Sequence, residues 1–394
     1  SDQNTVTTNA AGVKLSSYAT TEAADENASG KFIFQVQPTI TVSAGKHEKT
    51  YGTLLTDDDL HAYLTDESYA TATFKGADGK DYKVTDYKTA FEEKAPSNYI
   101  DGTTITLSSK AAPAEATRLD GNKTAPKTET GLDGKDRTVY PVYDLAVNIG
   151  NAVKKNGYGL QKEDGQITIN AKPVTLSGSG EQTYGTSTIT KWIDTTTGTL
   201  FGAKVSYDTL TGKTPTIKTG SSYDQNWKNY HPNGSTADAS DTAYQDALDS
   251  SNFSNINISD AAGNDMSANY TVTTTGDLKV NKADIILNLS DVETTYGEAF
   301  DTSKYGYDHN NIPVLNGDAV SVITDNLQNK DLKYTNTGDG TNGRITQDAD
   351  NDYKLKADDK SLGNYNIHFN DGKSVLIKRN FLLQRRILRR SMVR

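Results

Sequence analysis

The sequence of 394 residues contains no cysteine, two tryptophans, two methionines and nine prolines. The lack of cysteine excludes disulfide bonds, zinc–thiolate sites and cysteine nucleophiles, and it leaves the cellular compartment open. Apolar residues make up 34% of the chain, and the mean hydropathy is −0.67. No apolar run approaches the length of a membrane-spanning helix, so we expect no membrane span. Any hydrophobic core must be thin and divided among small units.

Positively charged residues are fewer than acidic residues over most of the chain. The formal charge is −10, although residues 381–394 contain five arginines and no acidic residue. The rest of the chain is therefore more acidic than the total suggests. An acidic body repels phosphate groups, which argues against a nucleic-acid partner.

Tyrosine is abundant, with 22 residues against nine phenylalanines. Tyr and Thr suit a sheet surface that is half buried and half wet. Short alternating apolar segments, such as Phe32, Phe34 and Val36, recur between Gly-, Asn- and Asp-rich turns. The pattern predicts a mostly β protein built from tandem small modules in an elongated array. Each module is expected to be a sandwich or β-grasp-like unit with room for one short helix.

One motif occurs three times: an apolar strand followed by Thr-Tyr-Gly, at Tyr51-Gly52, Tyr184-Gly185 and Tyr296-Gly297. Tyr158 precedes Tyr184 by the same number of residues as Tyr270 precedes Tyr296, which argues for repeated domains. Gly reaches positive φ at little cost, and Tyr can lay its ring over the edge of a core. We interpret these pairs as structural turns; the alternative is a ladder of tyrosines that binds glycan.

The predicted domain boundaries fall where a closing strand meets a new opening strand, as at Lys172-Pro173 and Lys282-Ala283. So short a connection continues strand into strand and favours a semi-rigid rod. The predicted segments are 1–37, the C-terminal part of a preceding repeat; 38–172, repeat 1 with an insertion at about 109–137; 173–282, repeat 2 with an insertion at about 208–250; 283–380, repeat 3; and 381–394, an atypical basic tail outside the fold.

Three short helices are predicted inside these repeats. Residues 57–64 begin with three aspartates, which the helix dipole favours in a first turn. Residues 241–248 are expected to form one or two helical turns. Asp318 is expected to be the N-cap of a helix that continues to Ile323.

The order of motifs resembles the MBG and YDG repeats of large bacterial surface adhesins of the filamentous-haemagglutinin type. In that family a Tyr-Gly turn is followed by Asn-Gly-Asp, and the repeat closes with Asn-Tyr and a final strand. Repeat 3 matches best, with Tyr296-Gly297, Asn316-Gly317-Asp318 and Asn364-Tyr365. Repeat 2 keeps Asn269-Tyr270 but lacks Asn-Gly-Asp, and repeat 1 closes on Gly157-Tyr158.

The resemblance implies a secreted, extracellular, β-rich stalk on a bacterial cell surface. Its main partners would be the neighbouring repeats of the same chain. The function that we expect is therefore a structural, non-catalytic spacer. The alternative is a module that binds host glycan or mucin directly.

That alternative has its best candidates in the polar insertion of repeat 2, which contains Tyr223, Trp227, Tyr230 and His231. Aromatic side chains on an exposed loop can stack on sugar rings, and loops often carry function. The same four residues could instead fold back as a small satellite core.

Four aspartates have a spacing similar to a calcium loop: Asp348, Asp350, Asp352 and Asp359. Such loops need Gly at the sixth position, where this sequence has Tyr353, and Glu at the twelfth, where it has Asp359. We prefer a solvated acidic turn and expect no cofactor beyond weak calcium binding.

Signals for catalysis are lacking. The five histidines are scattered without a His-x-x-x-His pair, and the sequence has neither a Gly-x-Ser-x-Gly motif nor a phosphate-binding loop. Acidic residues are abundant, but no pair is distinguished as that of a glycosidase. We therefore expect that the protein is not an enzyme.

Overall fold

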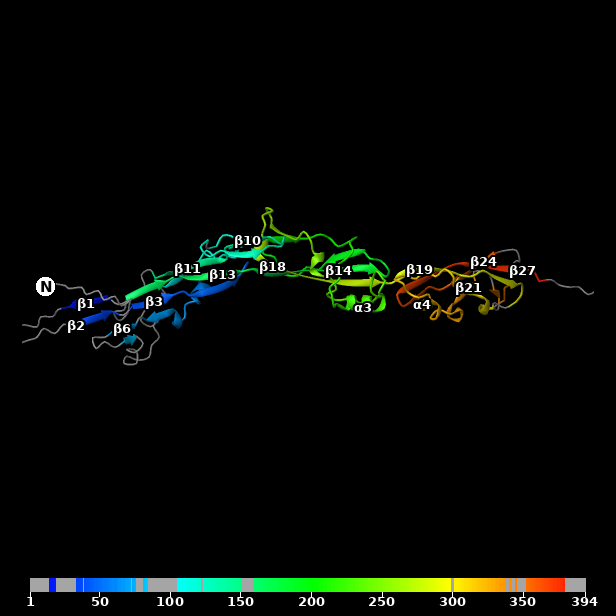
Figure 1. Cartoon of the computed structure of the whole chain (residues 1–394), viewed down its shortest axis with the longest axis horizontal. Coiled ribbons are helices and arrows are strands. Elements are labelled where there is room, and N and C mark those ends of the chain that lie inside the picture. Colours follow the sequence, from blue (N-terminus) through cyan, green and yellow to red (C-terminus); the bar gives the residue numbers. More distant parts are fainter. Residues whose placement is uncertain are drawn as a thin grey trace, which may run out of the picture. The chain divides into compact units, whose positions relative to one another are not determined.

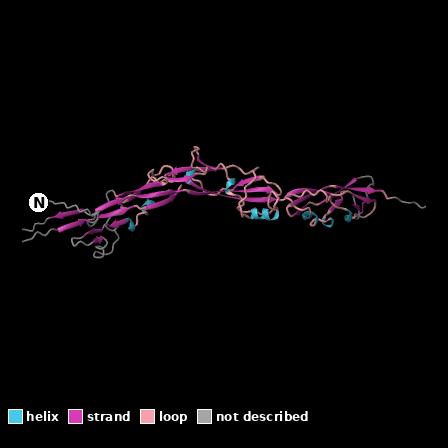
Figure 2. Ribbon diagram, in the orientation of Figure 1, coloured by secondary structure: helices cyan, strands magenta, loops and turns pink. Residues whose placement is uncertain are grey.

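The computed structural model is mostly β, with 40% strand and 12% helix, and its strands form several small sheets (Figure 1, Figure 2). This confirms the β-rich class expected from the sequence. None of the described helices has the length and hydropathy needed to cross a membrane. The structure describes residues 14–18, 33–37, 39–71, 73–75, 81–83, 105–121, 123–149, 159–298, 301–336, 340–341, 344–345 and 352–379.

The chain forms two compact units. The N-terminal unit comprises residues 1–174, 198–207 and 255–273, and the C-terminal unit comprises residues 175–197, 208–254 and 274–394. Both units take in segments of the predicted repeat 2. The predicted repeat boundaries therefore remain predictions, and the two units are described separately below.

The N-terminal unit contains a four-stranded sheet in the order β4-β13-β11-β8 and a three-stranded sheet in the order β12-β3-β5. The first is formed by β4 (Lys46–Thr50), β13 (Gly165–Asn170), β11 (Val142–Asn148) and β8 (Thr106–Ser108). The second is formed by β12 (Gly159–Glu163), β3 (Thr39–Ser43) and β5 (Tyr69–Thr71).

Smaller elements complete this unit. The strands form the antiparallel pairs β1–β2, β6–β7, β9–β10 and β16–β17. Their bounds are β1 (Lys14–Tyr18), β2 (Ile33–Gln37), β6 (Thr73–Lys75), β7 (Asp81–Lys83), β9 (Lys127–Thr130), β10 (Asp136–Val139), β16 (Ala203–Ser206) and β17 (Asn257–Asp260). The predicted helix at 57–64 is found as α1 (Asp57–His61), where Thr56 and Asp59 form a capping box that satisfies free N–H groups of the first turn.

The core of the N-terminal unit includes buried side chains from both sheets, through Val42 of β3 and residues of β8, β11 and β13. Its buried side chains include Leu145, Ile167 and Ile169, together with Val174 and Tyr270. The core thus contains residues on both sides of Lys172, so the connection predicted there does not interrupt the apolar packing.

The C-terminal unit contains a four-stranded sheet in the order β20-β27-β24-β21 and a three-stranded sheet in the order β19-β26-β25. The bounds are β20 (Val292–Thr295), β27 (Gly372–Ile377), β24 (Asp352–Ala357), β21 (Tyr334–Asn336), β19 (Ala283–Asn288), β26 (Tyr365–Asn370) and β25 (Lys360–Leu362). Strand β19 buries Ala283, Ile285 and Leu287 and exposes the residues between them, as expected for a half-buried strand.

Both four-stranded sheets have the same arrangement of strands. In each, the opening strand pairs in parallel with the closing strand, as β4 does with β13 and β20 with β27. The closing strand then pairs antiparallel with the next strand, β11 or β24, which pairs antiparallel with an edge strand, β8 or β21. The three-stranded sheets also share a parallel pair, β3–β12 and β19–β26.

Two long strands, β14 (Lys172–Thr183) and β18 (Tyr270–Asn281), are adjacent in a third sheet of order β15-β14-β18, with β15 (Lys191–Asp194) at its edge. In the C-terminal unit, helix α3 (Ser222–Tyr230) follows Ser221, whose side chain accepts a hydrogen bond from the Asp224 N–H. That unit also contains α4 (Ser321–Thr324) and the short pair β22 (Gly340–Thr341) and β23 (Arg344–Ile345).

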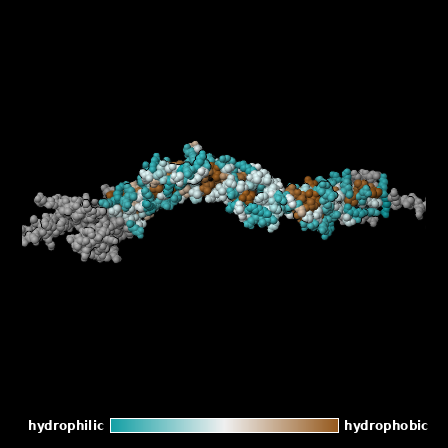
Figure 3. All heavy atoms as spheres, viewed as in Figure 1, coloured by the Kyte–Doolittle hydropathy of each residue, from teal (hydrophilic) through white to brown (hydrophobic). Residues whose placement is uncertain are grey.

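Two of the helix predictions are wrong. Residues 241–248 form turns and isolated bridges instead of a helix, because Tyr244 and Leu248 pair with the backbone of β18 at Leu278 and Gly276. The N-cap of α4 is Val320 and not Asp318. The carboxylate of Asp318 instead accepts hydrogen bonds from the hydroxyl groups of Tyr184 and Tyr365. On the face of the molecule shown in Figure 3, apolar residues form small separate patches in a hydrophilic surface.

Candidate functional site

The three Tyr-Gly segments form the same backbone turn, which we call the Tyr-Gly corner. Gly52, Gly185 and Gly297 have φ values of +85°, +81° and +80°, which an L-residue rarely adopts. The residue after each glycine donates its N–H to the carbonyl three positions earlier, at 2.9–3.1 Å. Glycine therefore occupies a turn position with positive φ at all three corners.

Each corner is also fixed to a closing strand by one backbone hydrogen bond. The N–H of the corner tyrosine donates to the last residue of that strand. The three bonds are Tyr51 N to Asn170 O at 2.9 Å, Tyr184 N to Asn281 O at 2.8 Å, and Tyr296 N to Ile377 O at 3.0 Å. The three corners therefore share their backbone geometry.

The side chain of Tyr184 is buried against residues that are distant in sequence, in what we call the Tyr184 contact. Its ring meets the ring of Tyr365 edge to face, with centroids 5.5 Å apart and planes at 85°. Both hydroxyl groups donate to Oδ2 of Asp318, at 2.8 Å from Tyr184 and 2.6 Å from Tyr365. Burial raises the pKa of both tyrosines above the ordinary value, and the Asp318 carboxylate raises it further.

An apolar side chain covers the glycine of the same corner. A Cβ placed on Gly185 would lie 2.7 Å from Cδ1 of Leu315, so only glycine fits beneath this leucine. Leu315 is held there because its N–H donates to the hydroxyl of Tyr365 at 2.9 Å. Asn316, the next residue, accepts a hydrogen bond from the Ser235 N–H at 2.7 Å and donates to the Thr236 carbonyl at 2.9 Å.

The N-terminal unit contains a similar arrangement, the Tyr51 contact. The rings of Tyr51 and Tyr270 meet edge to face, with centroids 5.5 Å apart and planes at 76°. Phe201 takes the place of Leu315, because its Cβ lies 3.0 Å from a Cβ built on Gly52. The hydroxyl of Tyr270 donates to the Phe201 carbonyl at 3.3 Å. Burial raises the pKa of Tyr270 to about 12.

The asparagine that precedes Tyr270 or Tyr365 is held in a matching way. Oδ1 of Asn269 accepts a hydrogen bond from the Arg118 N–H at 2.8 Å. Oδ1 of Asn364 accepts one from the Ala239 N–H, also at 2.8 Å. Arg118 and Ala239 lie in the two segments predicted as insertions, so each insertion holds an Asn-Tyr pair.

Arg118 is itself anchored by its side chain. Its Nε donates to the Ile169 carbonyl at 3.1 Å, and its Nη1 donates to the Ala268 carbonyl at 2.6 Å. The guanidinium also pairs with both carboxylate oxygens of Glu129. Hydrogen bonding to the Arg118 guanidinium holds the pKa of Glu129 below its usual value. A buried guanidinium therefore joins the first insertion to strand β13 and to the segment before Tyr270.

Of the four predicted ligand-binding residues, the structure buries two and partly buries a third. The hydroxyl of Tyr223 donates to Oε1 of Gln182 at 2.8 Å, and Nε1 of Trp227 donates to the Gly234 carbonyl at 2.8 Å. The ring of His231 lies between two carboxylates, in contact with Asp238 and 3.3 Å from Asp318. Tyr230 is the exception, with 68% of its surface exposed.

Asp238 connects His231 to the Asn-Tyr pair. Its Oδ1 accepts hydrogen bonds from the Asn364 amide, at 2.7 Å, and from the His231 ring. Burial acts to raise the pKa of Asp238, but the bonds from His231 and Asn364 outweigh it and lower the pKa below the usual value. These groups satisfy one another, which is typical of a structural network.

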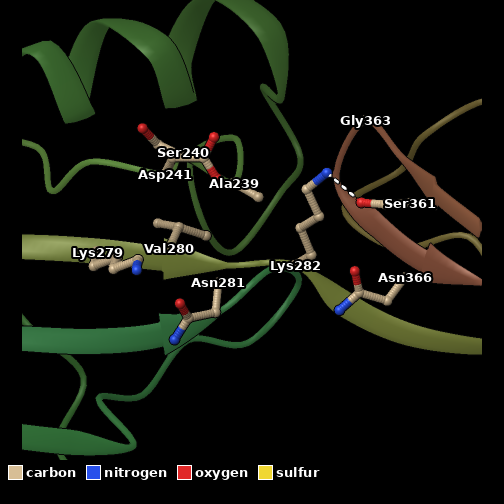
Figure 4. A pocket seen from close by; sticks show the side chains of 10 residues that line it. All are labelled: Ala239, Ser240, Asp241, Lys279, Val280, Asn281, Lys282, Ser361, Gly363 and Asn366. Carbon is tan, nitrogen blue, oxygen red and sulfur yellow. Dashed lines mark hydrogen bonds between the residues drawn. The ribbon is translucent and has the colours of Figure 1, made fainter.

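Two grooves lie in the C-terminal unit near Gly363. One has a volume of about 480 Å³, and Tyr230, Asp238 and Asn364 are among its lining residues. The other, of about 640 Å³, is lined by polar side chains from the 239–241 loop, the end of β18 and strands β25 and β26 (Figure 4). In it the Lys282 ammonium donates to Oγ of Ser361 at 2.7 Å.

Of the four aspartates of the predicted calcium loop, Asp348 and Asp350 lie outside the described part of the chain, and Asp352 begins strand β24. Asp359 is described, and its Oδ2 lies 2.8 Å from Nδ1 of His368. Among the residues that the structure describes, no group of three or more His, Asp or Glu side chains is placed to hold a metal ion.

Sequence reasoning found both tyrosines of each contact but missed the residues around them. Phe201 and Leu315 are apolar residues in polar loops, and neither follows a strand or helix period. The signal available for Leu315 was its position directly before Asn316-Gly317-Asp318. Nothing in the sequence around Arg118 or Asp238 indicates that either residue contacts an Asn-Tyr pair. Comparisons with protein-family models, curated proteins and solved structures find no match to this chain.

Proposed function

We propose that the chain is a non-catalytic spacer region of a secreted bacterial cell-surface adhesin. In this proposal, successive small β modules follow one another along the chain in an elongated array. The observation that carries it is the repeated use of one contact, in which a Tyr-Gly corner is covered by an Asn-Tyr pair and an apolar side chain from later in the sequence.

The two contacts have the chemistry of a rigid joint. Each combines an edge-to-face pair of tyrosines with a glycine covered by a bulky side chain, and such ring pairs contribute about 0.5–1.5 kcal/mol beyond the area that they bury. Asn269 and Asn364 add hydrogen bonds to the preceding insertion. Because the covalent connection at Lys282-Ala283 is also short, bending there would have to break the Tyr184 contact.

The bacterial and extracellular parts of the proposal rest on the resemblance to MBG and YDG repeats. The two matched four-stranded sheets support the idea of a repeated module, because their strand order and pairing agree throughout. A fully satisfied buried polar network rigidifies the fold that contains it, which is useful in a spacer. The hydrogen-bonded arrangement of His231, Asp238 and Asp318 suits that role.

The alternative, direct binding of host glycan or mucin, retains one supporting observation. Tyr230 is exposed beside a groove that also contains the polar side chains of Asn326 and Asn364. An exposed aromatic ring can stack on a sugar, and neighbouring amide groups can form hydrogen bonds with the hydroxyl groups of that sugar. Tyr223 and His231 are not available for stacking, because both are buried.

Binding of the whole chain to a glycan array and to immobilised mucin separates these two functions. A spacer is expected to give signals at background level, equal to those of a Tyr230→Ala variant. Saturable binding that is lost in Tyr230→Ala would instead establish the glycan-binding alternative.

A further inference from the structure

We propose that the parallel strand pairs of each unit form a mechanical clamp that resists tension applied along the chain. The pairs are β3–β12 and β4–β13 in the N-terminal unit, and β19–β26 and β20–β27 in the C-terminal unit. The purpose of this clamp rests on the proposed function, because a spacer that links a cell to a surface carries the force that pulls the two apart. The resistance itself follows from the direction and register of the strands.

The paired strands of the C-terminal unit belong to two segments that run in the same direction. The chain enters β19 after Lys282 and continues through β20 to Thr295, and this stretch is the opening segment. The closing segment consists of β26 and β27, and the chain leaves it at Lys378. Tension between Lys282 and Lys378 therefore pulls the opening segment toward its beginning and the closing segment toward its end. Because the segments are parallel neighbours, they must slide past each other, and their cross-strand hydrogen bonds share the load.

The N-terminal unit has the same arrangement. Its opening segment consists of β3 and β4, and its closing segment consists of β12 and β13. The register contains ten facing residue pairs in each unit, five and five in the N-terminal unit and six and four in the C-terminal unit. A lengthwise pull loads all of these pairs at once. A pull across the strands opens the ladder from one end, so that the load falls on one bond after another.

Hydrogen bonds also bridge the point at which each pair of segments passes from one sheet to the other. The bonds are Ala44 N to Glu163 O at 3.1 Å and Gln166 N to Gly45 O at 2.9 Å in the N-terminal unit, and Leu289 N to Asn370 O at 3.1 Å and Lys373 N to Asp291 Oδ1 at 2.8 Å in the C-terminal unit. The ladders of the two sheets are thereby joined, and lengthwise tension loads both sheets together.

The Tyr-Gly corner ends each ladder. The N–H of Tyr51 or Tyr296 donates to the carbonyl of the last residue of the closing segment, Asn170 or Ile377. The glycine that follows the tyrosine then turns the opening segment away at positive φ, while the closing segment continues along the chain. The last bond of the ladder therefore lies where the closing segment leaves the unit, which is where tension reaches it.

Amide side chains add further bonds between the opening and closing segments. These bonds run from Asn170 to Oε2 of Glu48 at 2.8 Å, from Asn366 to Oδ1 of Asp284 at 3.0 Å, and from Asn370 to Oδ1 of Asn288 at 2.8 Å. Each one joins an opening segment to a closing segment across the register. The sliding motion that loads the backbone ladder therefore loads these side-chain bonds as well.

The test pulls the whole chain in two directions with optical tweezers. The sequence contains no cysteine, so two introduced cysteines fix where the handles attach. Lys282→Cys with Lys378→Cys loads the ladder of the C-terminal unit lengthwise. Glu293→Cys with Val375→Cys pulls across the strands, because these two exposed residues face each other in β20 and β27. Handles are coupled under reducing conditions, so that no disulfide forms between the facing cysteines.

We expect the unfolding force at equal loading rate to be at least about twofold higher lengthwise than across the strands, because many bonds share the load in the first direction. Unfolding of the strands between the lengthwise handles is recognised by a gain in length of up to about 3.6 Å per released residue. Forced unfolding depends on the unfolding rate. Denaturant titration of each variant is therefore the control for differences in equilibrium stability.

A second crosswise pair, Tyr296→Cys with Lys378→Cys, shares one handle with the lengthwise pair and opens the ladder from its C-terminal end. It is expected to yield at the same low force as the first crosswise pair. The proposal is wrong if either crosswise pair withstands as much force as the lengthwise pair. Because the measurement uses no glycan, its failure is distinct from failure of the spacer function. A chain that binds glycan saturably and still resists lengthwise force would refute the spacer function and leave the clamp in place.

Discussion

The ring of Tyr184 stands edge-on to the ring of Tyr365, and both hydroxyl groups donate to one oxygen of Asp318. A single carboxylate therefore joins two tyrosines that lie 181 residues apart in sequence. Asp318 is nearly buried, with 9% of its side chain exposed, so loss of either donor leaves a poorly solvated charge.

Replacement of Tyr184 by phenylalanine is expected to destabilise the C-terminal unit. Tyr184→Phe keeps the ring but removes the donor to Asp318, and hydrogen bonds to charged groups contribute about 1.5–3 kcal/mol. Amide exchange measured by mass spectrometry should show faster opening of β26 and β27 and no change in β11 and β13. Tyr230→Phe, at an exposed ring, is the control and should change stability by less than about 0.5 kcal/mol.

Two glycine substitutions separate the cost of backbone strain from the cost of a clash with Leu315. Gly185→Ala and Gly297→Ala impose the same strained φ, which costs about 1 kcal/mol or more. Gly185→Ala also drives a methyl group into Leu315, so it should cost clearly more than Gly297→Ala. Chemical denaturation of both variants provides the comparison. Equal losses would mean that Leu315 does not contact the corner in solution.

Each asparagine of the two Asn-Tyr pairs should stabilise the insertion that it contacts, and Asn364→Ala should cost more because it also removes the amide donor to Asp238. Asn269→Ala and Asn364→Ala each leave a backbone N–H without its acceptor, at a cost of about 1–3 kcal/mol. We expect the first variant to loosen residues 117–119 and the second to loosen residues 238–240, as seen by amide exchange. Asn370→Ala removes an exposed amide and is the matched control. Loss of protection throughout both units would contradict a local role.

Stability of the C-terminal unit should fall in alkaline solution. Tyrosine ionises near pH 10 in an unfolded chain, whereas burial raises the pKa of Tyr244 to about 12 and also raises the pKa of Tyr184 and Tyr365. The folded unit keeps protons that the unfolded chain releases, so these groups leave stability unchanged below about pH 10. Above that pH, each lowers it by about 1.4 kcal/mol per pH unit until its folded pKa is reached.

Denaturant titrations between pH 9 and pH 12 check this dependence, with Tyr184→Phe as the comparison. The variant lacks one of the titrating groups and should lose stability less steeply than the original chain. Parallel pH profiles for the two proteins would show that Tyr184 ionises as freely in the folded unit as in the unfolded chain.

The sequence predicted the β-rich class and the strands well, because period-2 alternation is local and strong in segments such as Ala283–Asn288. It predicted the Tyr-Gly turns because glycine adopts a positive φ at little cost. The helix at 222–230 was missed because its residues are polar apart from three aromatic side chains, which were interpreted as part of a loop. The helix expected at 241–248 failed because that segment pairs with β18.

The surroundings of the corners could not be predicted, for a physical reason. Phe201 contacts Tyr51, Arg118 contacts Asn269, and Asp238 contacts Asn364. All three contacting residues lie in loops, and the positions of these loops depend on tertiary packing and not on any local period. His231 shows the same limit. An aromatic side chain in a polar loop resembles a binding residue in sequence, and its partners, Asp238 and Asp318, become evident once the chain is folded.

Small-angle X-ray scattering of the whole chain tests most directly the central claim that its modules follow one another in an elongated array. A compact globule of this length would have a radius of gyration of about 21 Å. The account predicts a radius of gyration well above that value and a distance distribution with a long tail. A radius of gyration near 21 Å, with a symmetric distance distribution, would contradict it.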